Sequence, residues 1–324
     1  MRTSVALATY NGAEYLEEQL RSVRLQTRPV DELVVLDDRS SDSTLETAYR
    51  CVAAWNGLPT RITISQNPHN RGIVGNFEEA LGRCQGDVIF LCDQDDHWHP
   101  NKVARMLLEF EQRPDLLLLY TNARLVDRYG KSLGATQFAA LEVSRHEIDL
   151  VRSQRGFEAL LTRNLVTGAT VALRRELLAL ATPFPSTWVH DEWLAVVAAA
   201  VGVIDVLDEC LIDYRQHGKN QIGMHRKTRI ERIGEVFSQR GTFYQHEAER
   251  STELLGHLER LGARVSADKL DSLRERIAHL RFRASLPPSR ARRVVPIAGE
   301  ALSGRYSRYG RGLRSIVRDL FETI

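Results

Sequence analysis

The densest group of acidic side chains in the sequence follows an apolar run. Residues 93–96, Asp-Gln-Asp-Asp, come directly after residues 88–92, Val-Ile-Phe-Leu-Cys. Three carboxylates within four residues repel one another unless a cation offsets their charge. Mg²⁺ and Mn²⁺ prefer oxygen ligands, and Mg²⁺ is usually held by one or two carboxylates together with substrate phosphates. The run therefore predicts a divalent metal site. The alternative is a solvated acidic turn before a helix that starts near Pro100.

Residues 37–44, Asp-Asp-Arg-Ser-Ser-Asp-Ser-Thr, form a second polar cluster. Short oxygen-bearing side chains in such a position usually accept hydrogen bonds from the free N–H groups at the start of a helix. Two adjacent aspartates are more than a helix cap needs, and a carboxylate can also accept hydrogen bonds from a nucleobase or a ribose. The pattern is consistent with helix capping and with nucleotide binding.

Two further clusters lie later in the sequence. In residues 188–194, Trp-Val-His-Asp-Glu-Trp-Leu, burial among apolar groups would raise the pKa of an acid toward the range of a general base. The alternative there is the acidic first turn of a helix. Residues 214–221, Tyr-Arg-Gln-His-Gly-Lys-Asn-Gln, are consistent with a surface loop, or with a histidine metal ligand and cations for a diphosphate leaving group.

Several common catalytic motifs are absent from the sequence. It contains no GxxxxGK[ST] loop, no GxGxxG after the first apolar run, no GxSxG and no HExxH. These absences argue against a P-loop NTPase, a dinucleotide-binding enzyme, a serine hydrolase and a zinc protease.

Short β-like runs alternate with helical patterns over the first 120 residues. Strands are expected at 5–9, 33–37, 61–65 and 87–92, and helices near 13–25, 41–55, 72–84 and 100–112. This alternation predicts βαβ units and a mostly parallel sheet. In an open α/β sheet the carboxyl ends of the strands meet at one edge, where ligands bind. The polar residues that follow the four strands are therefore expected to face one crevice.

The rest of the chain is less regular at first and then helical. Strands are expected at 116–120 and 169–173, and a helix opens near Asp191. From Arg226 onward, apolar residues recur every three to four positions, which predicts helices. We expect one α/β domain over residues 1–225 and a basic helical region over residues 226–324.

The end of the sequence has the pattern of a basic amphipathic helix. Apolar residues from Tyr306 to Phe321 trace one helical face, while arginines from Arg308 to Arg318 trace another, and Gly310 and Gly312 weaken the helix. The pattern is consistent with association with an anionic membrane surface, and equally with a helix that packs on a domain or a second subunit.

Composition limits the class of protein. The 324 residues are 43% hydrophobic and 27% charged, as in a soluble globular protein of about two domains. The net charge of +2 conceals an acidic part up to residue 225 and a basic part after it, which has 21 Lys and Arg against 12 Asp and Glu. Four cysteines without CxxC spacing argue against a disulfide scaffold or a zinc ribbon and favour a reducing compartment. No apolar run reaches signal-peptide or membrane-spanning length, so we expect no integral membrane protein.

Taken in order, these clusters resemble the family 2 glycosyltransferases of the GT-A fold, and most closely their bacterial rhamnosyltransferase-type members. The resemblance covers about residues 1–225 and is carried by segments 8–12, 36–44, 70–72 with Asn76, 93–98, 190–193 and 214–217. Each segment is weakly specific alone, but six in the family's order are specific. The resemblance implies an α/β GT-A fold: a Rossmann-like, mostly parallel sheet with helices on both faces, followed here by a C-terminal α-helical region.

The resemblance also implies roles for individual residues. Contacts to the sugar-nucleotide would come from Thr9, Tyr10, Glu14, Asp37, Asp38, Asn70, Arg71, Asn76, Asp93, Gln94, His190, Trp193, Arg215 and Lys219. Asp93, Asp95 and His217 would hold Mg²⁺ or Mn²⁺, and Asp191 would be the general base. His190 stands where the family more often has glutamate, and the extra Glu192 leaves the choice between two acids open.

The implied activity is inverting, metal-dependent transfer of a sugar from a nucleotide-diphosphate donor. The donor is expected to be dTDP-L-rhamnose, and the acceptor a hydroxyl of a cell-surface polysaccharide or of a lipid-linked glycan. The resemblance implies a cytoplasmic location, which the basic C-terminal region extends to peripheral contact with the inner face of the plasma membrane. A homo-oligomer is also consistent with the sequence.

Three alternatives compete with this hypothesis. A sugar-1-phosphate nucleotidyltransferase shares the α/β layout, but residues 8–12 lack its glycine-rich basic loop. A non-catalytic scaffold that binds sugar nucleotides does not need the intact Asp93, Asp95 and Asp191. A nucleic-acid surface needs aromatic residues between the arginines as stacking platforms, and few are present. We therefore expect no nucleic-acid partner.

Overall fold

The computed structural model describes residues 1–55, 57, 59–217 and 242–322. These residues form two compact units, the first within Met1–Gln154 and Leu165–Met224, and the second within Arg155–Asn164 and His225–Ile324. Residues 155–164 therefore group with the second unit, although their sequence pattern assigns them to the first domain. The reason is that helix α7 (Gly156–Thr162) packs against α12 (Ala267–Ala284).

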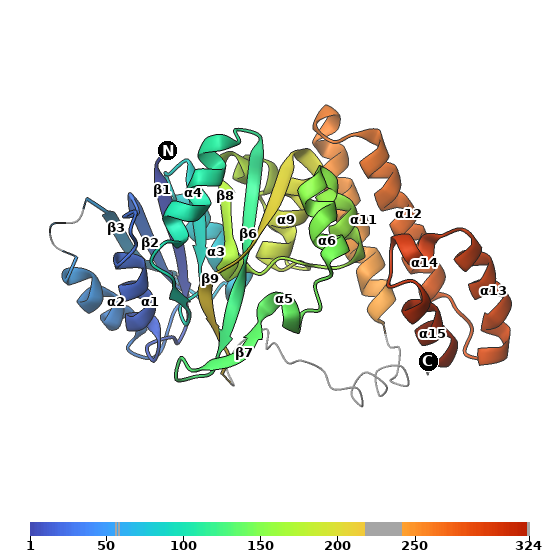
Figure 1. The fold of residues 1–324 in the computed structure, drawn as a ribbon, viewed down its shortest axis with the longest axis horizontal. Helices are drawn as coiled ribbons and strands as arrows, with labels where there is room; N and C mark the ends of the chain where they lie inside the picture. The colour runs from blue at the N-terminus through green and yellow to red at the C-terminus, as the bar shows by residue number, and fades with distance from the viewer. Residues whose placement is uncertain (56, 58, 218–241, 323–324) are drawn as a thin grey trace. The chain divides into compact units, whose positions relative to one another are not determined.

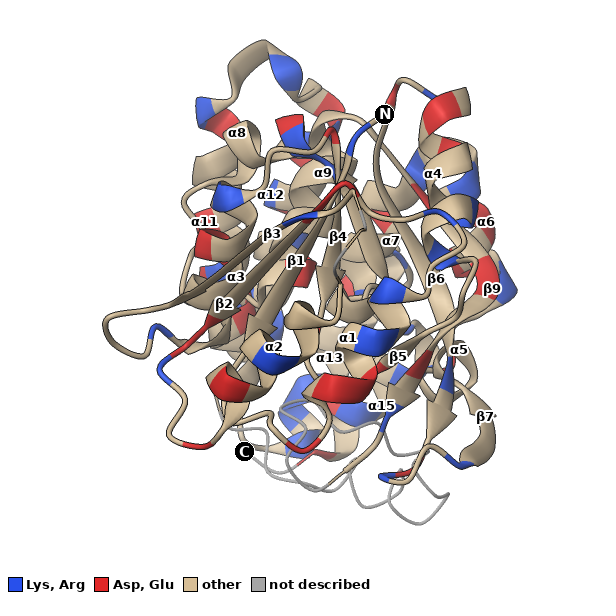
Figure 2. Cartoon of the chain, turned by 90° about the vertical axis from the view of Figure 1, so that its left-hand side faces the viewer, with Lys and Arg blue, Asp and Glu red and all other residues tan. Residues whose placement is uncertain are grey.

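The first unit is built on one sheet, whose parallel half carries the first polar clusters. It consists of β1 (Thr3–Thr9), β2 (Glu32–Asp37), β3 (Arg61–Gln66) and β4 (Val88–Cys92), which lie in the order β3-β2-β1-β4 (Figure 2). The connecting helices are α1 (Leu16–Arg24), α2 (Thr44–Ala53) and α3 (Gly72–Arg83). All four strands are parallel, and the order changes direction between β1 and β4, where an α/β sheet opens its ligand crevice.

The other half of the sheet extends beyond β4. It consists of β8 (Val171–Arg174), β6 (Leu116–Val126), β9 (Val203–Arg215) and β5 (His97–Trp98) in that order, with β7 (Ser132–Thr136) paired to β6. Strand β8 runs antiparallel to both neighbours, whereas β6 and β9 are parallel. The sequence pattern does not predict β9, because acidic residues interrupt its apolar alternation. Its carboxyl end carries residues 214–217 to the aspartate cluster.

The core explains why the parallel strands have almost continuous apolar sequences. Every residue of β1, β2 and β4 is buried, as in strands covered on both faces. Val5 and Leu7 of β1 share a core with Leu16 and Leu20 of α1, while α3 packs against β1 and β2. The remaining helices of this unit are α4 (Lys102–Gln112), α5 (Gln137–Ala140), α6 (Arg145–Leu150), α8 (Leu178–Ala181) and α9 (His190–Val201) (Figure 1).

The second unit is helical, as its periodicity predicts. Besides α7 and α12 it contains α11 (Phe243–Arg260), α13 (Arg290–Leu302), α14 (Arg305–Arg308) and α15 (Leu313–Phe321). The prediction of one continuous amphipathic helix from Tyr306 to Phe321 is wrong, because the helix is broken between α14 and α15. Gly312 at the break has a φ of 55°, a backbone conformation that favours glycine. No helix in the described part of the chain combines the length and the apolar character that crossing a membrane requires.

Candidate active site

The carboxyl end of β2 carries two aspartates with different surroundings. Asp37 is fully buried, and both of its oxygens are occupied: Oδ1 accepts from the Thr9 hydroxyl at 3.0 Å, and Oδ2 accepts from the Gln66 amide at 2.8 Å. The Ser40 hydroxyl and N–H donate to the same carboxylate. Asp37 therefore fixes the ends of β1, β2 and β3 relative to one another. The first N–H of α2, that of Thr44, donates instead to Oδ1 of Asp42 at 3.0 Å.

Asp38 has one occupied carboxylate oxygen. Its Oδ1 accepts from Asn67 Nδ2 and from the N–H of Arg71, both at 2.8 Å, and its carbonyl accepts from Asn70 Nδ2 at 3.0 Å. Among the described residues, no donor reaches Oδ2 of Asp38. The structure thus brings Asp38, Asn70 and Arg71 together, and Asp38 keeps an acceptor that Asp37 lacks. The Arg71 guanidinium is paired with Glu79 at 2.7 Å.

Asn76 lies inside the protein rather than at the crevice. It is 3% exposed, and its amide donates to the carbonyls of Leu36 and Thr9 at 3.1 and 3.4 Å. Its oxygen accepts from Asn67 at 3.0 Å. These contacts join the ends of β1 and β2 and engage both polar atoms of the Asn76 side chain.

The loop after β1 is tied to the loop after β4 by a side-chain amide. Gln94 accepts from the N–H of Tyr10 at 2.8 Å and donates to the carbonyl of Tyr10 at 3.0 Å. A Cβ at Gly12 would lie 2.0 Å from Oε1 of Gln94, so a larger residue there would displace this amide from Tyr10. Both polar atoms of the amide are engaged with the backbone, while the Tyr10 side chain is 48% exposed. Glu14 accepts from Arg128 at 3.2 Å.

The aspartates after β4 occupy a poorly solvated site. Burial raises the pKa of Asp93 well above its usual range, and the charges of Asp95 and Asp191 raise it further. Burial also raises the pKa of Asp96, with contributions from Asp95 and Asp93. Asp96 is 1% exposed; its Oδ1 accepts from the N–H of Arg215 at 3.0 Å, and among the described residues its Oδ2 has no hydrogen-bond partner. These carboxylates carry an electrostatic cost that a cation would relieve.

Asp95 contacts His217, which follows β9. The Oδ2 atom of Asp95 lies 2.7 Å from Nε2 of His217, whose ring stacks on Tyr15 with the ring centres 4.9 Å apart. A carboxylate and an imidazole are suitable ligands for Mn²⁺, and Mg²⁺ sites need few protein ligands when phosphates and waters complete the shell. Within the described residues, however, no three His, Cys, Asp or Glu side chains converge on one metal position. The structure therefore pairs Asp95 with His217 and does not gather Asp93 as a preformed third ligand.

Arg215 and Trp193 are buried and hydrogen-bonded within the protein. Arg215 is 2% exposed, and its guanidinium donates to the carbonyls of Asp95 and Arg128 and to Glu18, at 2.6 to 3.1 Å. It braces residues 93–96, which we call the aspartate loop. Trp193 is fully buried, and its indole N–H donates to the carbonyl of Ala181 at 2.7 Å. Lys219 lies outside the described residues.

Asp191 stands at the start of α9, close to the aspartate loop. It is 5% exposed, and its two oxygens accept from the N–H groups of Gly168 at 2.6 Å and Glu192 at 2.7 Å. Burial raises the pKa of Asp191 to about 6, against the opposing effect of these backbone hydrogen bonds. Since the charge of Asp191 also acts on Asp93, residues predicted from two distant segments lie at one site.

His190 is a neutral side chain inside the same region. It is 3% exposed and stacks on Phe77, with the ring centres 4.0 Å apart. Burial lowers the pKa of His190 to about 3, and neither ring nitrogen has a hydrogen-bond partner among the described residues. A Cβ at Gly168 would lie 2.9 Å from its Nε2, so a larger residue there would displace His190. The residue next to Asp191 thus has two ring nitrogens that no described residue hydrogen-bonds.

Lys102 is a site residue that the sequence analysis missed. It is fully buried at the start of α4, where its ammonium donates to the carbonyl of Ala169 at 2.6 Å and lies 4.2 Å from the centre of the Trp98 ring. Burial lowers its pKa to about 8, while the charges of Asp96 and Asp93 act in the opposite direction. A lysine on the apolar face of an amphipathic helix was the signal that could have revealed it.

Replacing Lys102 with methionine is expected to destabilise the first unit by about 3 kcal/mol, because it leaves buried carboxylates without their nearby cation. This corresponds to a fall in melting temperature of roughly 6 to 12 °C. Arg105→Met, on the same helix, is the matched control: its ion pairs with Glu109 and Glu209 are partly exposed and worth less than about 1 kcal/mol. Equal, small shifts for both variants in thermal unfolding would contradict the role assigned to Lys102.

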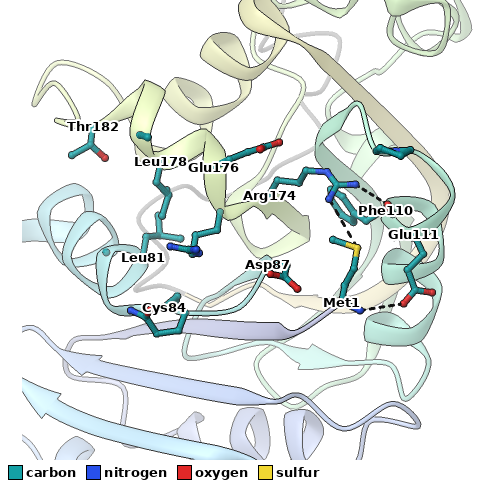
Figure 3. Close-up of a pocket in the computed structure, with 15 residues that line it drawn as sticks. Met1, Leu81, Cys84, Asp87, Phe110, Glu111, Arg174, Glu176, Leu178 and Thr182 are labelled. Atoms are coloured by element: carbon teal, nitrogen blue, oxygen red, sulfur yellow. Dashed lines mark hydrogen bonds and ion pairs between the residues drawn. The ribbon is translucent and has the colours of Figure 1, made fainter.

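A separate cavity of about 850 Å³ lies at the opposite ends of the strands. Its walls include Met1, which precedes β1, and Asp87, which precedes β4 (Figure 3). Arg174 on this wall donates to the carbonyl of Phe110 at 2.7 Å. None of the predicted site residues lines this cavity, so the chemistry suggested by the sequence is confined to the carboxyl edge of the sheet.

Comparison with known sequences gives a consistent result for the first unit. Residues 4–178 match the family model described as "Glycosyl transferase family 2". An uncharacterized glycosyltransferase of Nostoc sp. is 28% identical over 227 residues, which cover 68% of this chain and 66% of the relative. The chain spans 58 to 66% of the length of the first curated relatives that it matches.

Comparison with solved structures addresses the fold. TarS (1–349) of S. aureus, in complex with UDP-GlcNAc, has a TM-score of 0.59 and 18% identity, covering 99% of this chain and 89% of that one. The mannosyltransferase PcManGT of Pyrobaculum calidifontis, in complex with GDP-Man and Mn²⁺, has a TM-score of 0.54 and 17% identity, covering 98% and 84%. These likenesses confirm the expected α/β GT-A fold.

Proposed function

Because the chain belongs to glycosyl transferase family 2, we propose that it transfers a sugar from a nucleotide-diphosphate donor to a hydroxyl group, with inversion at the anomeric carbon. The observation that carries the proposal is that one short turn contacts both Asp191 and the lysine beside Asp93 and Asp96. In the turn before β8, the N–H of Gly168 holds Asp191, while the carbonyl of Ala169 holds Lys102, which faces Asp93 and Asp96. A candidate base and a candidate leaving-group site are thus fixed by two adjacent residues.

The nucleotide is proposed to bind along the ends of β1 and β2. Of the two aspartates there, Asp38 is the better candidate for the nucleobase, because its Oδ2 has no donor among the described residues, whereas Asp37 accepts four hydrogen bonds. The exposed Tyr10 ring is positioned by Gln94 to border the nucleoside. Thr9 and Glu14 are proposed to act at the same edge.

The diphosphate is proposed to lie near Asp95 and His217, which would hold Mg²⁺ or Mn²⁺. When bound, such a cation neutralises the charge that develops on the departing diphosphate. The Asp95–His217 pair supports this assignment through its donor chemistry, and the mannosyltransferase of similar fold was crystallised with Mn²⁺. Arg215 acts on this site indirectly, by holding the carbonyl of Asp95 and the carboxylate of Asp96.

Asp191 is proposed as the general base. It takes the proton of the acceptor hydroxyl, whose oxygen forms a bond to the anomeric carbon as the bond from that carbon to the diphosphate breaks. A single displacement inverts the configuration and needs no covalent intermediate. The two backbone N–H groups fix the orientation of the carboxylate, and His190 offers its ring nitrogens to a hydroxyl in the same region.

The donor is proposed to be dTDP-L-rhamnose, and the acceptor a cell-surface polysaccharide or a lipid-linked glycan on the cytoplasmic side. The donor and acceptor rest on the resemblance of segments 190–193 and 214–217 to rhamnosyltransferase-type sequences. Slow transfer to water tests the donor without an acceptor: the chain is incubated with dTDP-rhamnose, UDP-GlcNAc or GDP-mannose and Mn²⁺, and the released nucleoside diphosphate is measured. Release from dTDP-rhamnose alone is expected. Release from another donor would overturn the choice of sugar, and release from none would contradict the transferase activity.

The rate is expected to rise with pH through about 6. Below that pH Asp191 is protonated and cannot accept a proton, because burial raises its pKa to about 6; above it the carboxylate is free to act. The measurement is kcat/KM for donor turnover between pH 5 and 8. Glu192→Gln is the matched control, because Glu192 is the adjacent acid. The rate of this variant should still rise with pH through about 6. If the rate of Glu192→Gln did not rise with pH in this range, Glu192 rather than Asp191 would be the base.

A further inference from the structure

The outward side of α13 is apolar. Val294, Val295 and Leu302 are 53%, 79% and 90% exposed, and Ala298 between them is also exposed. Residues three, four, seven and eight positions apart share one face of a helix, so these side chains form a continuous row. The side of the helix that is turned to the core carries the buried Arg293 and Ile297. This pattern is the reverse of that of a surface helix, whose outward side is normally polar.

Helix α15 repeats this arrangement. Leu313, Val317 and Phe321, spaced by four residues, are 73%, 37% and 46% exposed. The neighbouring positions Ile316 and Leu320 pack against the core around Ile297 and Tyr306. Helix α15 therefore uses one part of its apolar side to pack with α13 and leaves the other part exposed. We call the two exposed rows the α13–α15 apolar surface: Val294, Val295, Ala298, Leu302, Leu313, Val317 and Phe321.

Within residues 290–322 the exposed charges have one sign, and Arg308 is in addition paired at 3.0 Å with Glu275 of α12. Residues 290–322 contain eight arginines and three carboxylates. All three carboxylates are turned inward: Asp319 pairs with Arg283 at 2.7 Å, Glu322 with Arg318 at 2.9 Å, and Glu300 with His279 at 2.7 Å. Arg290, Arg292, Arg308, Arg311 and Arg314 are exposed. Over residues 290–322 the outer surface thus presents apolar side chains and arginines, without an exposed carboxylate.

We propose that the α13–α15 apolar surface docks on a lipid bilayer that contains anionic headgroups. Interfacial helices insert apolar side chains at the headgroup boundary while cationic side chains meet lipid phosphates. A symmetric dimer through the same surface would bring arginines of one copy close to those of the other, with no exposed carboxylate within residues 290–322 to offset them. The charge pattern therefore favours an anionic membrane over a second copy of the chain. This inference does not depend on the proposed transfer reaction.

Vesicle flotation of the full chain tests the proposal. Vesicles of phosphatidylcholine are compared with vesicles that also contain phosphatidylglycerol, and only the second kind should bind. Leu302→Asp should weaken binding by at least about tenfold, the worth of burying one leucine. Arg290→Gln with Arg292→Gln should weaken it by about fivefold per arginine, and added salt should act in the same direction. All these side chains are exposed, so folding should be preserved.

Leu108→Asp is the matched control, because Leu108 is 45% exposed on α4 of the first unit. It should bind vesicles like the unchanged chain. Equal binding to both kinds of vesicle, or equal loss in Leu108→Asp, would overturn the proposal. So would absence of vesicle binding together with a dimer in sedimentation that Leu302→Asp dissociates, since the surface would then join two copies.

Discussion

Asp191→Asn should lower the rate of sugar transfer by about 10²- to 10⁴-fold, the usual contribution of a general base, while nucleotide binding stays within about twofold of the original. Asparagine has nearly the same shape, and its oxygen can still accept a hydrogen bond from Gly168 or Glu192. It cannot take a proton from the acceptor. The loss should therefore appear in kcat rather than in the affinity for the donor.

Two measurements separate this chemical effect from a structural one. Calorimetric titration of the nucleoside diphosphate with Asp191→Asn should give the same affinity as the unchanged chain, and thermal unfolding should show an intact first unit. Glu192→Gln, which removes the neighbouring carboxylate, should retain most of the activity. Full activity of Asp191→Asn would instead show that a group other than Asp191 takes the proton of the acceptor.

The parallel half of the sheet could be predicted from the sequence because its determinants are local. Strands β1, β2 and β4 are buried along their whole length, so their sequences are short apolar runs bounded by polar residues. The turns after them contain residues that bind their own backbone or the adjacent turn, such as Asp42 with Thr44 and Asn11 with Ser41. Local pattern is therefore sufficient to locate the edge of the sheet where the candidate site lies.

Strand β9 escaped prediction because its polar residues are matched by distant partners. Asp205 pairs with Arg113, Asp208 accepts from Asn122 at 2.9 Å, and Glu209 pairs with Arg105 at 2.9 Å. These contacts join residues 86 to 104 positions apart in the chain. A sequence shows four acidic interruptions in the strand, and only the folded chain shows which of them are satisfied.

The surroundings of several candidate site residues could not be predicted for the same reason. Arg215 and Trp193 have the side chains that a sugar-nucleotide site needs, but tertiary acceptors on Asp95, Glu18 and Ala181 hold them inside the protein. The role of Lys102 was missed because it depends on three groups outside its helix: the carbonyl of Ala169 and the carboxylates of Asp93 and Asp96. Residue type predicts what a side chain can do, whereas burial and partners determine whether a ligand can reach it.

Asp95→Ala should abolish the dependence of nucleotide binding on a divalent cation. The chain should bind one of dTDP, UDP and GDP at least about 100-fold more tightly with Mn²⁺ than with a chelator, because a metal contributes several kcal/mol to holding phosphate charge. The Asp95 carboxylate, 2.7 Å from His217, is the best-placed oxygen ligand of the aspartate loop. Removing it should bring the affinity with Mn²⁺ down to the value measured with the chelator.

The first unit offers a matched control for this experiment in a second aspartate–histidine pair. Oδ1 of Asp213 lies 2.8 Å from Nε2 of His99, and Arg124 binds the same carboxylate at 2.6 Å. Asp213→Ala removes an equivalent acid from the strand that leads to His217, yet it should leave metal-dependent binding unchanged. If nucleotide binding were equally tight with and without Mn²⁺, and equal in Asp95→Ala, the aspartate loop would not be a metal site. Raised pKa values of Asp93 and Asp96 would then reflect buried acids balanced by Lys102 alone.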